Sequence, residues 1–135
     1  MIRKSIVCLG IVVVLSGGWA VVSAQQAGTS KKAEKVLRHV VLLKFKDGAT
    51  PEQIKTMEDG FRALPGKIAF VHGFEWGTNV SVENLSQGFT HCFLVTFTSE
   101  EDRNKYIPHP AHQEFVELLR PHLDKVLVID YWVKD

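Results

Sequence analysis

Four apolar segments of the chain have the length and composition of β-strands. Two of them, residues 38–46 and 126–133, are rich in valine, leucine and isoleucine. The other two, residues 68–78 and 89–97, carry several aromatic side chains, and the first places aromatic rings at every second position. Branched and aromatic side chains favour extended backbone, and a period of two places alternate residues on one face of a sheet. The pattern therefore predicts four strands.

Between the first two strands, a period near 3.6 replaces the period of two and predicts a helix. Thr50 is suited to cap its start, Pro51 to occupy its first position, and Gln53 to complete a capping box. One apolar stripe follows at helical spacing, formed by Ile54, Met57, Phe61 and Leu64. Pro65 and Gly66 are expected to end this helix.

A second helical region, interrupted by a proline corner, precedes the last strand. Ser99 caps an acidic turn that opens a short helix ending near Tyr106. Pro110 begins another helix, and Pro121 ends it. The resulting order, β-α-β-β-α-β, predicts an α+β domain with one antiparallel sheet and its helices on one face.

The first and last strands are apolar on both faces. A sheet with one solvated face normally alternates apolar and polar residues, but residues 38–46 and 126–133 carry valine or leucine at odd and even positions alike. Helices on one side cover only one of these faces. We therefore expect a second copy of the chain to cover the open sheet face, which makes the protein an obligate homodimer.

The first 24 residues have the features of a signal peptide. Arg3 and Lys4 precede an apolar run at residues 6–14, and small side chains around Ala24 form a cleavage site. Cleavage near Ala24 predicts an exported chain, periplasmic or secreted, with a flexible tether at 25–36 and a domain at 37–135. The alternative is a retained membrane anchor; after cleavage, no membrane partner is expected.

Charge and cysteine content narrow the choice of partners. The formal net charge is +1 for the whole chain and −1 without Arg3 and Lys4, so no basic surface for nucleic acid is expected. Cleavage also removes Cys8 and leaves a single cysteine, which forms no internal disulfide. This residue, Cys92, falls inside an apolar strand, where a small buried side chain is the expected role and a reactive thiol the alternative.

Five short motifs are distinctive as a set. They are HVVLLKFK at 39–46, FEWG at 74–77, GFTH at 88–91, YIPHPAH at 106–112 and DY at 130–131. Together they resemble the stress-responsive dimeric A/B barrel (Dabb) family over nearly the whole mature chain. The resemblance implies a ferredoxin-like monomer whose sheet pairs with that of a second copy to close a dimeric α/β barrel. It implies no single function, because some members are stress-induced proteins and one plant branch is a metal-free polyketide cyclase.

The resemblance also indicates candidate catalytic residues. A Tyr and a His of the cyclase branch align with Tyr106 and His112, and further pocket histidines align with His39 and His91. In an aldol closure His112 would be the base and Tyr106 would hold the carbonyl oxygen. The alternative is that Tyr106 and His112 fill the corner between two helices, in a domain that binds a small apolar ligand and catalyses nothing.

A pocket is expected where large apolar side chains accompany the histidines. His39 and His91 share the phase of neighbouring aromatic residues, so both enter one pocket if their strands are adjacent; the alternative is that both are core residues. Phe74, Trp76 and Phe89 are further candidates for the lining, with core or interface roles as the alternative.

Metal binding and cofactor chemistry are alternative roles for the same histidines, and the sequence supports them less well. His109 and His112, together with His91, would supply three nitrogens, but the spacing is loose and the prolines place the first two on a corner. We therefore expect no metal and no cofactor. A heme-degrading monooxygenase is a further alternative, although no axial ligand can be singled out.

Overall fold

The computed structural model describes residues 35–134. The predicted signal peptide at 1–24, and the predicted tether up to residue 34, lie outside the described residues. The elements follow the predicted order and are β1 (Leu37–Phe45), α1 (Pro51–Lys67), β2 (Gly73–Thr78), β3 (His91–Phe97), α2 (Glu100–Tyr106), α3 (Pro110–Leu119), the short 3-10 helix η1 (Arg120–His122) and β4 (Leu123–Trp132). In this part of the chain, no helix is long and apolar enough to cross a membrane.

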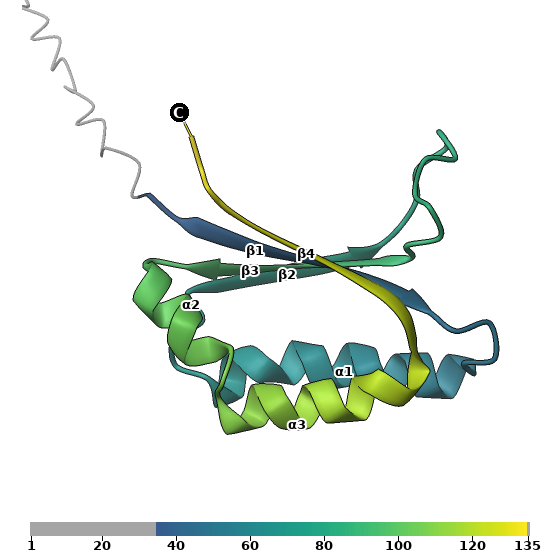
Figure 1. The fold of residues 1–135 in the computed structure, drawn as a ribbon, viewed down its shortest axis with the longest axis horizontal. Coiled ribbons are helices and arrows are strands. Elements are labelled where there is room, and N and C mark those ends of the chain that lie inside the picture. Colours follow the sequence, from purple (N-terminus) through teal and green to yellow (C-terminus); the bar gives the residue numbers. More distant parts are fainter. Residues whose placement is uncertain (1–34, 135) are drawn as a thin grey trace, which may run out of the picture. The chain divides into compact units, whose positions relative to one another are not determined.

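The four strands form one antiparallel sheet in the order β2-β3-β1-β4. Figure 1 shows α1 and α3 side by side beneath this sheet, while no helix or strand of residues 35–134 covers its upper face. The predicted α+β class, with helices on a single face, is therefore confirmed. Because β1 lies between β3 and β4, its residue His39 is aligned with Val95 on one side and Asp130 on the other.

Helix α1 starts as its sequence predicts but continues further. The Thr50 hydroxyl accepts a hydrogen bond from the backbone N–H of Gln53, and the Gln53 side chain accepts one from the Thr50 N–H. The helix then passes through Pro65 and ends at Lys67. Proline removes only its own donor, and the N–H of Ile68 still donates to the Leu64 carbonyl at 2.9 Å, which closes the last turn.

The second strand begins later than expected. The predicted range was 68–78, whereas β2 starts at Gly73. Ile68 is 1% exposed and forms the C-cap of α1, so its apolar character belongs to a buried helix end. The chain then turns before the strand, and the N–H of His72 donates to the Thr96 carbonyl.

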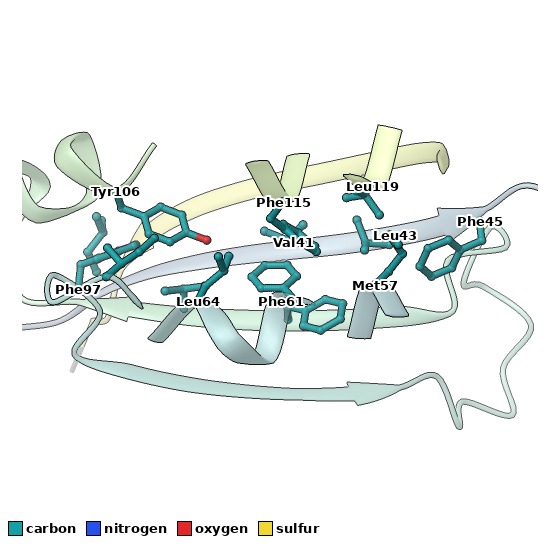
Figure 2. Packing of buried hydrophobic residues seen from close by; sticks show 14 residues of the cluster. Val41, Leu43, Phe45, Met57, Phe61, Leu64, Phe97, Tyr106, Phe115 and Leu119 are labelled. Atoms are coloured by element: carbon teal, nitrogen blue, oxygen red, sulfur yellow. The ribbon is translucent and has the colours of Figure 1, made fainter. Parts of the chain in front are cut away.

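The core fills the layer between the sheet and the helices, as Figure 2 shows. Every odd residue of β1 is buried, and the apolar stripe of α1 packs against the same layer. At its centre the rings of Phe61 and Phe93 stack with centroids 4.1 Å apart. Burying one such side chain stabilises a fold by about 1.5–3 kcal/mol, so this layer accounts for much of the stability.

The upper face of the sheet is also apolar and is exposed in the single chain. Leu127, Ile129 and Tyr131 are each between 42% and 49% exposed. Cys92 lies on this face and is exposed in the single chain, although part of its thiol is shielded from water, so the expectation of a side chain buried within the domain was wrong. The reason is register: the even positions of β3 alternate away from the helices. Burial and the nearby Glu75 carboxylate raise the pKa of the Cys92 thiol, which disfavours the reactive thiolate.

Candidate functional site: a cleft between the last strand and the last helix

A cleft of about 450 Å³ separates β4 from α3 on the helix-covered side of the sheet. Val126 and Val128 of β4 are 51% and 48% exposed at its rim, although their side chains face the helices. His39, His112 and Arg120 are the titratable residues of its lining. The other lining residues are apolar: Val41, Phe61, Ile107, Phe115, Val116, Leu119, Leu123, Val126 and Val128. Such a lining suits a small, mostly apolar molecule with few polar groups.

The corner between α2 and α3 brings Tyr106 and His112 together. Tyr106 is the last residue of α2, and Pro110 starts α3 after a turn closed by a hydrogen bond from the His109 N–H to the Tyr106 carbonyl. The His109 ring caps α3 by accepting from the Ala111 N–H at 3.2 Å. The rings of Tyr106 and His112 consequently lie 4.5 Å apart between centroids. The structure therefore places the Tyr106 and His112 side chains next to each other, as the stiff corner predicts.

His112 is held in a defined tautomer. Its Nδ1 lies 2.8 Å from the carbonyl oxygen of Ile107, which only accepts hydrogen bonds, so Nδ1 carries the proton. The second ring nitrogen, Nε2, therefore keeps its lone pair in the neutral ring. Burial lowers the pKa of His112 below its ordinary value, and the hydrogen bond to the Ile107 carbonyl opposes this effect. A positive charge on His39 or His109 would lower the pKa of His112 further. The ring is neutral at neutral pH and suited to accept a proton.

Tyr106 carries a buried hydroxyl with no hydrogen-bond partner among residues 35–134. The side chain is fully buried, and burial raises the pKa of Tyr106, so the hydroxyl stays protonated. In Figure 2 this hydroxyl points along the core layer toward Phe61 and Phe115, both of which line the cleft. A buried donor left without a partner costs about 1–3 kcal/mol, so an exception of this kind calls for an explanation.

His39 completes this end of the cleft, with partners that the sequence did not reveal. Its ring lies 5.9 Å from that of Tyr106, and its Nδ1 donates to Asp130 Oδ1 at 2.7 Å. The other oxygen of Asp130 accepts from Arg103 of α2. One signal for Asp130 was available, because it is an acidic residue inside the apolar run of the last strand. Nothing in the sequence aligned it with His39, which depends on the β1–β4 register.

His91 lies at the far end of the same sheet face and does not line this cleft. It is aligned with Leu43, four residues along β1 from His39. Its Nε2 donates to Glu58 of α1 at 3.0 Å, so its Nδ1 accepts from the Thr90 hydroxyl at 2.8 Å. Phe45 packs edge-on against the ring at 5.1 Å. The structure therefore separates the two histidines that were expected to share one pocket.

The three aromatic candidates for the pocket also lie away from the cleft. Phe74 packs against Phe61 at 5.7 Å, and Trp76 stacks on Phe93 at 5.6 Å, so both are partly buried side chains that pack against the core. Phe89 borders a separate depression of about 390 Å³ beneath the β2–β3 loop, which His91 also lines. The cleft itself uses residues that the sequence did not single out as a site, among them Ile107 and Arg120.

The histidines of the corner do not form a cluster of metal ligands. Within residues 35–134, no three His, Cys, Asp or Glu side chains converge in a way that could hold an ion. The set considered from the sequence was His109, His112 and His91. His91 lies at the other end of the sheet, and the His109 Nδ1 is occupied as a helix cap.

Comparison with known proteins assigns nearly all of the described chain to the family that its motifs resemble. The profile of the stress responsive A/B barrel domain matches residues 37–133. The stress-response A/B barrel domain-containing protein HS1 of Arabidopsis thaliana is 48% identical over 101 residues, which cover 75% of this chain and 93% of HS1. Olivetolic acid cyclase of Cannabis sativa is 36% identical over 95 residues, covering 70% of this chain and 94% of the cyclase.

Solved structures extend these similarities. The hydroxynitrile lyase of Passiflora edulis is 26% identical and superimposes with a TM-score of 0.71, over 76% of this chain and 96% of the lyase. Three further structures, 18% to 26% identical with TM-scores of 0.60 to 0.65, are described as dimeric proteins with a ferredoxin-like fold. They cover 73% to 75% of this chain and 93% to 99% of their own chains.

Proposed function

Since the chain belongs to the stress-responsive A/B barrel domain family, we propose that it binds a small, mostly apolar carbonyl compound in the cleft between β4 and α3. The observation that carries this proposal is the hydroxyl of Tyr106, which has no hydrogen-bond partner among residues 35–134 and belongs to a ring packed against the His39 and His112 rings. A ligand carbonyl that reached this donor would satisfy it, and the apolar walls would hold the rest of the molecule.

The proposed binding protein is a homodimer formed through the open sheet face. The exposed apolar side chains of β4 support this, because a contiguous apolar surface of this kind is rarely left open to water. The structural neighbours that are described as dimeric support it too. Light scattering at micromolar concentration should give the mass of two chains. Ile129→Lys, which places a charge in that face, should give the mass of one, and a wild-type monomer would contradict the proposal.

Matched ligand pairs test the binding proposal. Straight-chain methyl ketones should raise the melting temperature of the protein, while alkanes of the same length should do so less. Both members of a pair bury nearly the same apolar area, but only the ketone presents an acceptor to the Tyr106 hydroxyl. Equal stabilisation by ketone and alkane would contradict a role for this donor, and no stabilisation at any chain length would contradict the cleft as a binding site.

A cofactor-independent lyase or cyclase is the second candidate function, and the tautomer of His112 favours it. With Nδ1 tied to Ile107, a neutral ring offers Nε2 as a base beside a protonated Tyr106. In an aldol closure, Nε2 would take the proton next to a carbonyl while Tyr106 donates to the enolate oxygen. In the cleavage of a hydroxynitrile, Nε2 would take the hydroxyl proton as the carbonyl forms and cyanide leaves.

Two substrates probe this second function: a linear tetraketide acid and an aromatic hydroxynitrile. The relatives named as a cyclase and a lyase motivate the choice. Formation of a ring from the first, or of aldehyde from the second, above the rate in buffer would support catalysis. Binding without turnover of either substrate would leave the chain a binding protein.

We also propose that the protein is exported, because its first 24 residues have the features of a signal peptide. We expect the mature chain to begin near Gln25 and to reside in the periplasm or outside the cell. N-terminal sequencing of the native protein tests this. Recovery of Met1 in a membrane fraction would indicate an anchor.

A further inference from the structure

Arg103 stands out among the charged residues near the cleft because it does not line the cleft yet bonds to a residue that orients one of the cleft's histidines. Its guanidinium donates to Asp130 Oδ2, while Asp130 Oδ1 accepts from His39 Nδ1 at 2.7 Å. The three side chains come from α2, β4 and β1. Their side chains are 20%, 27% and 9% exposed, in the order Arg103, Asp130, His39, so water screens this chain of contacts only in part.

We propose that Arg103 is a positioning residue for the cleft: by neutralising Asp130, it keeps His39 uncharged, with the proton on Nδ1 and the acceptor Nε2 available to a ligand. The inference rests on the proposed function, because it is the cleft that gives His39 a role. It adds a ligand property to that function. A neutral His39 accepts a hydrogen bond from a hydroxyl or enol, whereas an imidazolium would donate one and attract an anion.

Two basic side chains, Arg103 and His39, share the negative charge of the Asp130 carboxylate. A carboxylate within hydrogen-bonding distance favours the charged form of an imidazole. Here the same carboxylate already faces a guanidinium, which remains charged at all physiological pH values. Among the described residues, Arg103 and His39 are the basic groups bonded to Asp130. With Arg103 present, an additional proton on His39 would give this group a net positive charge beside a buried tyrosine.

The other groups that face this cluster do not replace Arg103. From α3, His112 is neutral at neutral pH and packs against the Tyr106 ring with centroids 4.5 Å apart. From α2, Glu100 accepts from the Trp132 indole at 3.3 Å and carries the same charge sign as Asp130. From β3, the residue aligned with His39 is Val95, which is apolar. The positive charge that offsets Asp130 is therefore that of Arg103.

The local structure holds Arg103 in place for this contact. Ser99 caps α2 by accepting from the Asp102 N–H at 3.0 Å, and the Arg103 Nε donates to the Asn104 side chain at 2.8 Å. Arg103 is thus fixed at two points: its Nε on α2 and its terminal nitrogen on β4. A flexible surface arginine would not be held at two points, and ion pairs made by such exposed arginines contribute little to stability.

Nitrogen NMR of the histidine rings tests the inference without any ligand. In the wild-type protein at pH 7, His39 should show one protonated and one unprotonated ring nitrogen. In Arg103→Gln, the ratio of doubly to singly protonated His39 should rise by about tenfold, as expected from an unbalanced carboxylate. Arg103→Lys retains the positive charge and should stay close to wild type. Arg62→Gln, which removes an arginine paired with Asp59 on α1 at 3.3 Å, is the matched control and should change nothing at His39.

An Asp130→Asn background separates positioning from a structural role. Without the carboxylate, Arg103→Gln should no longer alter the protonation of His39, even if it alters the melting temperature. The inference is overturned if Arg103→Gln leaves His39 unchanged in the wild-type background, if its effect persists in Asp130→Asn, or if wild-type His39 is already doubly protonated. Since no ligand is needed, a failed ligand screen counts against the proposed function alone.

Discussion

Two histidines on the same face of the sheet have equal burial and opposite chemical situations. His39 and His91 are both 7% exposed, and each is bonded to a carboxylate from another element. Both ring nitrogens of His91 are used within the chain, by Glu58 and by Thr90. One ring nitrogen of His39 donates a hydrogen bond to Asp130, and His39 also lines the cleft between β4 and α3.

The difference between the two ends shows that burial and a charged partner do not identify a functional histidine. What separates them is whether a ring atom remains unused and whether neighbouring groups are satisfied. At the His39 end, the Tyr106 hydroxyl has no partner in the described part of the chain, and the His112 imidazole is fixed in one tautomer. At the His91 end, every polar atom of the ring has a partner, and Phe45 packs against it. The first arrangement suits a ligand, and the second suits stability.

The largest expected contrast between the two ends is in turnover. If the cleft catalyses proton transfer, His112→Asn should lower the rate of hydroxynitrile cleavage or tetraketide closure by about 10²–10⁴-fold. Asparagine retains a donor for the Ile107 carbonyl and lacks the base. His91→Gln at the other end should change the rate by no more than a few-fold per folded molecule. Similar losses in both variants would remove the contrast and end the catalytic reading.

Stability should show the reverse contrast. His91→Ala removes two hydrogen bonds and leaves a cavity beside Phe45, so the free energy of unfolding should fall by about 2–4 kcal/mol. His39→Ala should cost less, about 1–2 kcal/mol, because Asp130 keeps Arg103 and the cleft already admits water. Urea denaturation of the two variants measures the difference. A larger loss in His39→Ala would mean that the His39 end is the structural one.

Tyr106→Phe should separate ligand binding from stability within the cleft end. Removing the unpartnered hydroxyl should raise the free energy of unfolding by about 1 kcal/mol and weaken ketone binding by about five- to tenfold. Thr56→Val is the control, because it removes a hydroxyl from an exposed position of α1 that does not line the cleft. Thermal melts and ketone titrations on both variants decide the matter, and a destabilised Tyr106→Phe would show that the hydroxyl has a partner in solution.

The smallest expected effect is the pH dependence that His112 adds to stability. Its pKa in the folded chain lies below the ordinary value of 6.5, so the unfolded chain binds its proton more readily. The contribution is complete above about pH 6.5 and is lost as the pH falls through the folded pKa. Melting temperatures measured from pH 7.5 down to pH 5 should fall less steeply in His112→Asn than in wild type. Equal slopes would mean that burial does not shift this group.

The sequence determined the elements whose signals are local. The capping box of Thr50 and Gln53, the proline starts of α1 and α3, and the short α2 all follow from residues a few positions apart. The proximity of Tyr106 and His112 is of the same kind, because one stiff corner joins them. The apolar character of both sheet faces was also readable from alternation within single strands.

Only the tertiary structure decided how these pieces form a site. The order β2-β3-β1-β4 places Asp130 beside His39 and moves His91 to the far end, and this pairing joins residues about 50 to 90 positions apart. The same is true of Arg103, whose partner lies on another element. Helix α1 runs past Pro65 because Ile68 finds a buried position in the core. Sequence periodicity reports which face a side chain takes, whereas its partner depends on strand register and on packing between elements, which are set by long-range contacts.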